Sequence, residues 1–437
     1  MVAFHAGQKS TVYPNAPLGL VYPGDPGVPH GGVNAAIWNF APRIGFAWSP
    51  LGARTSIRGA YGIFLDSSMM SAIANRFENS PPHGMRVTLV PPPGPFDDPY
   101  LGASPFPIPI PPPRNIQFPN GLVAVTYPPD FKVAYLQSWN FTVEHELRRN
   151  LLARASYAGS KGTKLLQGVE LNGGVYIPGR STAANLASRQ PYAPALTTLT
   201  SLCFCGDSMF NSLQATLEKR FSGGLSVLAN YTLARSIDYG SGAGTLWPSY
   251  ANPNDFRFNR GLSDFFHKHR FVTSWIWELP HLNRQDRIMR AILGGWNVNG
   301  VFSYQTGAPF TITSGQDNSF SGLGTDRADL AGDWRVANPG PAAWFNTRAF
   351  APNAIGTFGN TGRNILIGPN FTSLDVSLVK DFAPRERLKL QFRAEAFNLP
   401  NHANFNQPAS SRASATFGQI TGSAAARVMQ FAIKLRW

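Results

Sequence analysis

Apolar and polar residues alternate strictly at the carboxyl end of the chain. Because successive side chains of a β-strand point to opposite faces, this pattern predicts a strand with one apolar and one polar side. The apolar side carries Met429, Phe431, Ile433, Leu435 and Trp437, and the polar side carries Gln430, Lys434 and Arg436. A transmembrane β-barrel closes on such a strand, with aromatic residues at the membrane interface. We therefore interpret Phe431, Ile433, Leu435 and Trp437 as part of a barrel-closing terminal strand.

The same period-two alternation predicts five hairpins upstream of this strand. They cover residues 41–49 with 54–66, 135–146 with 151–157, 213–218 with 225–233, 271–279 with 296–305, and 374–378 with 388–394. Together with the terminal strand, they give about eleven strands.

The expected connections between these strands fall into two classes that alternate along the chain. Connections near 50–53, 149–150, 222–224 and 383–386 are short, and the one near 281–294 is moderate. Connections near 67–132, 162–207, 239–267, 307–370 and 399–426 are long. Outer-membrane barrels have short periplasmic turns and long extracellular loops. The predicted fold class is therefore all-β: an antiparallel transmembrane β-barrel, partial, with about eleven strands of a larger barrel and long extracellular loops.

Composition agrees with a strand-and-loop protein of the membrane. Charged residues make up 14% of the chain, against about 25% in an average soluble domain, and Gly (42) and Pro (37) are plentiful. No segment approaches the roughly 18 uninterrupted apolar residues of a membrane helix, so a bilayer would be crossed by strands. The net charge is +14, but the basic residues are dispersed, which favours anionic lipid or ligand as a partner and excludes nucleic acid.

The amino terminus lacks the basic start, apolar run and small-residue cleavage site of a signal peptide. An odd number of antiparallel strands also leaves the two ends on opposite sides of a membrane. We therefore expect residues 1–437 to be the carboxy-terminal part of a longer barrel, a fragment or one product of a split gene.

Six short segments occur in an order that carries a family resemblance. They are Asn39–Pro50, Ser56–Phe64, Ser156–Thr163, Asn230–Ser236, Gly295–Gly300 and Arg393–His402. Together they resemble the carboxy-terminal half of a TonB-dependent outer-membrane receptor barrel, specifically its Oar-like branch. The resemblance implies a full-length barrel of about 22 strands, with an amino-terminal plug and a TonB box, neither of which we expect within residues 1–437.

The resemblance also implies a function and a location. The expected function is that of an outer-membrane receptor or transporter of a Gram-negative-type bacterium, which binds a siderophore, saccharide or peptide with its extracellular loops and passes it through the lumen. Implied partners are outer-membrane lipid, the barrel-assembly machinery through the terminal strand, and TonB only if the missing amino-terminal part is supplied. Two alternatives stay open: a surface-adhesion or structural barrel, and a secreted β-sandwich lectin.

Alternation assigns several side chains to one face or the other. Glu144, Glu146, Arg393 and Glu395 fall on the polar side, which predicts charged groups in the lumen, because a midplane Arg or Lys facing lipid costs about 2 to 4 kcal/mol. Aromatic residues near strand ends predict interfacial girdles. The girdle candidates are Trp275, Trp277, Trp296 and Trp437.

The sequence offers few candidates for a metal-binding or catalytic site. His267 and His269 are weak candidates for metal ligands, and the alternative is an interfacial polar cluster beside an aromatic strand. Cys203 and Cys205 lie in a loop-like stretch, as free thiols or an unusual local bridge. We find no convergent acid–base pair, nucleophile motif or cofactor fingerprint, so we expect no enzymatic activity and no cofactor.

Overall fold

The computed structural model describes residues 2–34, 39–50, 52–66, 81–84, 94–99, 101–102, 111–130, 132–241, 252–280, 289, 294–324, 326–385 and 388–436. Within these ranges, the side chains of residues 53, 256 and 383–385 are not described. Helices are few and short, the one α-helix of the described residues being α2 (Leu186–Arg189). No helix among them has the length and hydropathy needed to span a membrane.

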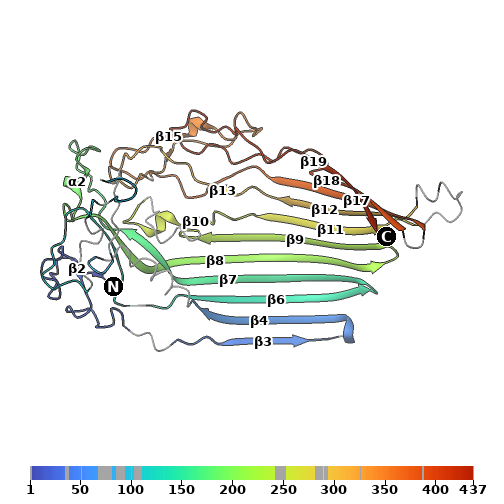
Figure 1. Ribbon diagram of the computed structural model, residues 1–437, viewed down its shortest axis with the longest axis horizontal. Coiled ribbons are helices and arrows are strands. Elements are labelled where there is room, and N and C mark those ends of the chain that lie inside the picture. Colours follow the sequence, from blue (N-terminus) through green and yellow to red (C-terminus); the bar gives the residue numbers. More distant parts are fainter. Residues whose placement is uncertain are drawn as a thin grey trace.

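A single large sheet forms most of the structure (Figure 1). It has 13 strands, and all but β5 and β10 form one continuous path in sequence order. The path consists of β3 (Arg43–Trp48), β4 (Thr55–Leu65), β6 (Tyr135–Arg148), β7 (Leu151–Glu170), β8 (Leu196–Ser222), β9 (Leu225–Asp238), β11 (His269–Glu278), β12 (Trp296–Gln305), β17 (Phe371–Arg385), β18 (Leu388–Phe397) and β19 (Val428–Arg436). These are the eleven expected strands, and neighbours pair antiparallel throughout. Along this path β3 and β19 are the two edges, so the sheet is an open, partial barrel.

Two short strands attach to this path. β10 (Gly261–Leu262) pairs with the end of β9, and β5 (Leu122–Thr126) pairs parallel with β8. Three further two-stranded pairs lie outside this sheet. β1 (Ala3–Phe4) pairs with β2 (Leu20–Val21) in the amino-terminal segment, and the 306–370 connection contains β13 (Pro309–Phe310) with β16 (Leu366–Ile367) and β14 (Asp329–Leu330) with β15 (Phe350–Ala351). The 3-10 segments are η1 (Gly52–Arg54), η4 (Phe256–Asn259) and η5 (Thr347–Ala349).

At one end of the sheet, tight turns join β6 to β7 and β8 to β9, and at the other end long connections join the strands (Figure 1). The β8–β9 turn uses Gly223 and Gly224, whose φ angles of 59° and 77° are the left-handed values that a two-residue hairpin turn requires. In the β6–β7 turn, Asn150 has a φ of 66°. The expected separation of short and long connections is therefore present, and we call the end with the long connections the outer end.

The β7–β8 hairpin is longer than the sequence pattern predicts. Residues 162–207 were expected to form a long connection, but the pairing continues to Glu170 opposite Thr200 and leaves only 171–195 between the strands. Register shifts on either side of Leu165, and a positive φ of 57° at Lys164, mark where regular alternation breaks. The prediction was wrong here because bulges hide a strand from a period-two reading.

The strand register gives the sheet one apolar and one polar face, because residues directly opposite in an antiparallel pair share a face. One row across the sheet, from β19 to β9, contains Phe431, Ala394, Leu378, Val298, Trp277 and Leu225. We call this side the apolar face. The next row, one residue along, contains Gln430, Glu395, Ser377, Asn299, Ile276 and Ser226 and belongs to the polar face. On the edge strand β19, Phe431 and Ile433 are 66% and 71% exposed rather than buried in a core.

The buried apolar clusters lie in the connections rather than between two sheets. One joins the amino-terminal segment to β8 and includes Leu20, Tyr22, Ala124 and Leu199. Another has all its buried members in the 306–370 connection, with Phe417 of the 399–426 connection packed against them, and we call it the loop core. Its buried members are Phe310, Ile312, Ala328, Phe345, Ala349, Phe350 and Leu366. A sheet with two exposed faces beneath ordered loops is the architecture of a membrane barrel wall rather than of a soluble sandwich.

Candidate functional site

The outer end of the sheet is where the structure gathers polar side chains from segments far apart in sequence. Arg363, in the connection before β16, is the centre of one such network. Its Nη1 lies 2.6 Å from Asp238 Oδ1 at the end of β9, and its Nη2 lies 2.8 Å from Asp264 Oδ1. Asn364 donates to the same Asp264 oxygen at 2.6 Å. The network fixes the 306–370 connection to the β9–β11 connection.

A second arginine ties the same two connections together deeper inside. Arg327 is only 4% exposed, and its guanidinium donates to the Phe258 carbonyl oxygen at 2.8 Å and to Asn259 Oδ1 at 3.0 Å. Burial, with a smaller contribution from the nearby Arg363, lowers the pKa of Arg327 to about 10. The group therefore remains charged at neutral pH and depends on these oxygen acceptors.

The loop core holds the 306–370 connection in one shape. Phe345 packs edge-on against Phe350 and Phe417, with ring centroids 5.5 Å and 5.2 Å apart. Edge-to-face packing of this kind adds to the stabilisation from burial. The described residues of the 306–370 connection thus form a packed surface above the strands, which we call the outer platform.

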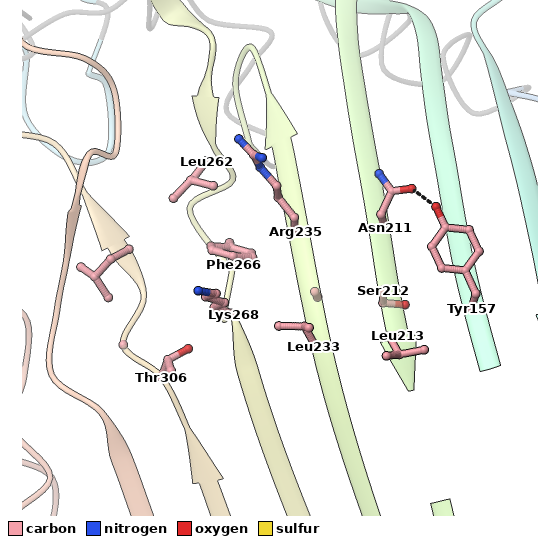
Figure 2. Close-up of a pocket in the computed structure, with 13 residues that line it drawn as sticks. Tyr157, Asn211, Ser212, Leu213, Leu233, Arg235, Leu262, Phe266, Lys268 and Thr306 are labelled. Atoms are coloured by element: carbon pink, nitrogen blue, oxygen red, sulfur yellow. Dashed lines mark hydrogen bonds between the residues drawn. The ribbon is translucent and has the colours of Figure 1, made fainter. Parts of the chain in front are cut away.

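A cleft of about 610 Å³ lies where this platform meets the apolar face (Figure 2). Its floor comes from strand residues of the apolar face, including Leu213 and Leu233, and Phe266 and Leu262 of the β9–β11 connection line its upper side. Tyr157 donates its hydroxyl hydrogen to Asn211 Oδ1 at 2.6 Å across β7 and β8. Arg235 and Lys268 add two exposed cations to the lining.

The predicted lumenal charges lie on the polar face, and several are paired. Glu144 Oε2 is 2.7 Å from Arg154 Nε and 3.1 Å from Arg58 Nη2. Arg393 Nη1 lies 3.8 Å from Glu395 Oε1. The Glu395 carboxylate also accepts hydrogen bonds from Gln430 Nε2 and from the Ser377 hydroxyl. Glu146 lies on the same face, opposite Leu152. Their lumenal role stays a prediction, while their common face follows from the register.

The polar face also has an apolar hollow that alternation did not indicate. It has a volume of about 380 Å³ and includes Leu228, Ile276 and Val301, which are 40%, 51% and 41% exposed. These side chains occupy positions where the pattern predicts polar residues. The register could have identified the patch, since Ser274 lies opposite both Leu228 and Val301, but the register is not visible in sequence.

The two candidate histidines are held separately. His267 Nδ1 lies 2.6 Å from the Thr306 carbonyl oxygen, and His269 Nδ1 lies 2.7 Å from the Tyr231 hydroxyl. The nearby Asp264 is engaged by Arg363 and Asn364. Among the described residues, no three His, Cys, Asp or Glu side chains form a group suited to a metal ion. The arrangement favours the interfacial polar cluster over the metal hypothesis.

The cysteines differ from the expectation in one respect. Cys203 and Cys205 form a disulfide, one of the two states left open by the sequence. They lie within strand β8 rather than in a loop, because β8 begins at Leu196. Gln167 of β7 pairs opposite Cys203 at this point of the hairpin.

The tryptophans predicted to form girdles cluster toward the turn end of the apolar face. Trp277 lies opposite Val298, and Trp296 starts β12 with its ring 5.2 Å from Lys380 Nζ. Trp275 lies opposite Gly300 and covers it. Trp437 lies outside the described residues. A girdle role for these residues remains a prediction.

Comparison with known proteins assigns the chain to a family. Residues 2–430 match the family described as "Outer membrane beta barrel domain". The chain belongs to this family. This outer membrane beta barrel domain is therefore a protein of the Gram-negative outer membrane, which confirms the predicted location. No curated protein matches its sequence.

Solved structures similar to this outer membrane beta barrel domain include three outer-membrane proteins. The outer membrane transporter YddB from Escherichia coli is 10% identical, with a TM-score of 0.49, 90% of this chain covered and 40% of that one. The FrpB iron transporter from Neisseria meningitidis (F3-3 variant) is 11% identical, with a TM-score of 0.42 and coverages of 91% and 39%. The siderophore receptor PiuA from Acinetobacter baumannii is 9% identical, with a TM-score of 0.40 and coverages of 90% and 35%. The chain thus spans about two fifths of the length of these structures.

Proposed function

We propose that this chain is the ligand-capturing barrel segment of a TonB-dependent receptor of the Oar-like branch. One observation carries the proposal: the sheet has an apolar and a polar face, and the outer platform lies at its outer end. Arg363 and Arg327 fix that platform from within. A ligand bound there would lie at the outer opening of whatever lumen the polar face lines.

We also propose that these strands are part of a larger barrel. Backbone groups facing hydrocarbon must all be hydrogen-bonded, so spanning sheets are closed. In the described sheet, the edge strands β3 and β19 each have one pairing partner. In the membrane, both edges therefore require a pairing partner, which we propose to be further strands, and transport through the lumen is a property of the closed barrel. TonB would act on such a receptor only through a plug and a TonB box.

The test uses the bacterium that carries the gene. Deleting the gene should reduce uptake of one class of labelled ligand in a panel of ferric siderophores, oligosaccharides and peptides, and deleting TonB should give the same loss. Complementation with an Arg363→Met variant should restore less uptake than the parent gene after the rates are normalised to the amount of folded protein, because the platform is loosened. An Arg335→Met variant is the matched control, since that arginine belongs to an exposed ion pair.

The same strains separate transport from adhesion. If the deletion leaves every uptake rate unchanged and instead abolishes attachment to surfaces or to other cells, the barrel is an adhesin and the receptor proposal fails. Unchanged uptake together with unchanged attachment also contradicts the proposal.

A further inference from the structure

Three buried side chains of the 306–370 connection each have an oxygen with no hydrogen-bond partner. Ser314, Asp326 and Asn353 are 3%, 2% and 2% exposed. Within the part of the chain that the structure describes, Ser314 Oγ, Asp326 Oδ1 and Asn353 Oδ1 have no hydrogen-bond partner. Buried polar groups are normally paired, and leaving one unpaired costs about 1 to 3 kcal/mol. Three in one loop therefore require an explanation.

The three side chains are joined through Asp326. The Ser314 backbone N–H donates to the Asp326 carbonyl oxygen at 3.0 Å. Asn353 Nδ2 donates to Asp326 Oδ2 at 3.0 Å. Ser314 and Asp326 are therefore neighbours through their backbones, and Asp326 and Asn353 through their side chains, so the three residues lie in one part of the connection.

The orientation of the Asn353 amide is fixed by its own contacts. Its Nδ2 donates both to Asp326 Oδ2 and to the Thr357 carbonyl oxygen, the latter at 2.6 Å. Reversing the amide would place its oxygen against two acceptor oxygens, because only the nitrogen end can donate. While Asp326 is ionised, Asn353 Oδ1 and Asp326 Oδ1 are both acceptors, and neither can satisfy the other.

The charge at this point is not balanced by a protein cation. No ion pair of the described residues includes Asp326. The adjacent Arg327 directs its guanidinium to Phe258 and Asn259 instead. Burial raises the pKa of Asp326, and the neighbouring Asp317 raises it further against the effect of its hydrogen bonds.

A second carboxylate, that of Asp317, adds negative charge near Asp326, and its own oxygens are engaged by other donors. Asp317 Oδ1 accepts from the Ser319 hydroxyl at 2.9 Å and the Ser321 N–H at 3.1 Å, and Oδ2 accepts from the Gly322 N–H at 2.8 Å. Both oxygens of Asp317 thus accept hydrogen bonds, whereas Asp326 Oδ1 has no donor among the described residues. The three oxygens without partners are one carboxylate oxygen, one amide carbonyl oxygen and one hydroxyl oxygen, all of them hard ligands.

We propose that Asp326, Asn353 and Ser314 form a calcium site that locks the outer platform. Oxygen-only ligands with one carboxylate suit Ca²⁺, which tolerates irregular geometry and completes its shell with water. With three protein oxygens, the expected dissociation constant is on the order of 10⁻⁴ to 10⁻³ M, the range of extracellular calcium modules. The ion would join the Ser314–Asp326 end of the connection to Asn353, and so stabilise the surface above the loop core.

The experiment measures calcium-dependent stability of the full chain in detergent. CaCl₂ should raise the thermal unfolding temperature of the parent with half-saturation in that concentration range, and MgCl₂ at equal concentration should give a much smaller shift. Asp326→Asn keeps the shape but removes the charge, so it should lose the calcium shift. Its calcium-free stability should equal or exceed that of the parent, because a buried charge is removed. Ser314→Ala should weaken calcium binding several-fold.

A control variant and three contrary results complete the test of the calcium site. Asp333→Asn removes an exposed carboxylate of the same connection and should keep the full calcium shift. A purely structural role for Asp326 predicts that Asp326→Asn is less stable with and without calcium, by the same amount. That result overturns the proposal, and so does an undiminished calcium shift in Asp326→Asn. The proposal also fails if the parent shows no shift at 10 mM CaCl₂, a concentration about tenfold above the weak end of the expected range.

Discussion

Arg363 and Asp238 are 125 residues apart in sequence, yet the guanidinium Nη1 lies 2.6 Å from the carboxylate Oδ1. Both side chains are nearly buried, at 11% and 8% exposure. The Asp264 partner of Arg363 is 60% exposed and contributes less, because solvent screens it. The pair therefore fixes a loop of the 306–370 connection to the last residue of a barrel strand.

Breaking this pair should loosen the outer platform. We expect Arg363→Met to destabilise the chain by about 3 to 5 kcal/mol, because it leaves Asp238 as an uncompensated buried charge. Urea unfolding in lipid vesicles measures the change, and limited proteolysis should show earlier cleavage in the outer connections. Arg335→Met should cost less than about 1 kcal/mol, as expected for an exposed pair. Equal effects of the two variants would contradict the assigned role.

The two faces of β19 predict opposite responses to the same charge. Ile433→Arg places a cation on the apolar face and should reduce folding into lipid vesicles, at a cost of up to about 2 to 4 kcal/mol near the bilayer midplane. Gln430→Arg places it on the polar face, opposite Glu395, and should be tolerated. Heat-modifiable gel migration measures the folded fraction. If Gln430→Arg is the more damaging change, the apolar face does not contact lipid.

Aromatic rings cover three strand glycines on the apolar face. Trp275, Trp139 and Phe46 lie directly opposite Gly300, Gly159 and Gly59, and a Cβ added at any of these glycines would overlap the ring. Such pairs shield a glycine that has no side chain of its own to pack.

The expected outcome of Gly300→Ala is a loss of about 1 to 3 kcal/mol, since Trp275 must move aside. Gly340→Ala is the matched control, because a Cβ there has no atom within 4 Å. Urea unfolding of both variants measures the difference. If Gly300→Ala is more stable than the parent, the packing of the Trp275 ring does not require a glycine at this position.

Two buried aspartates of the outer end should respond to pH with opposite signs. Burial alone would raise the pKa of Asp25, but hydrogen bonds from Ser10, Tyr22 and Thr11 outweigh it and lower the pKa. Its stabilising contribution is therefore present above the unfolded value near 3.8 and is lost as the pH falls through the lower, folded value. The pKa of Asp326 is raised, so without calcium its contribution grows as the pH falls from neutral through its folded value toward 3.8.

Thermal melts of Asp25→Asn and Asp326→Asn between pH 3 and 7, in calcium-free buffer, check these signs. Asp25→Asn should flatten the acid side of the stability profile and be less stable than the parent at neutral pH. Asp326→Asn should instead gain most over the parent near neutral pH. If both variants change the unfolding temperature at neutral pH in the same direction, the assigned environments of the two aspartates are wrong.

Alternation along the sequence was sufficient to predict the eleven-strand path and the two faces, because lipid on one side imposes a period of two. It failed where that constraint is absent. The extended ends of β7 and β8 contain bulges around Leu165, and β5 adds parallel to β8 from a distant segment. Likewise, the Arg363 network and the oxygens around Asp326 depend on side chains that only the folded loops bring together.

The loop core has a consequence for how this surface changes in evolution. Phe345 and Phe350, each 2% exposed, anchor the connection from inside, while residues such as Ile355, 55% exposed, form its outside. Any molecule that approaches the segment from solvent contacts only the outside. Substitutions at such exposed positions can accumulate without unfolding the segment, so its outer surface can change in sequence while the aromatic anchor is retained.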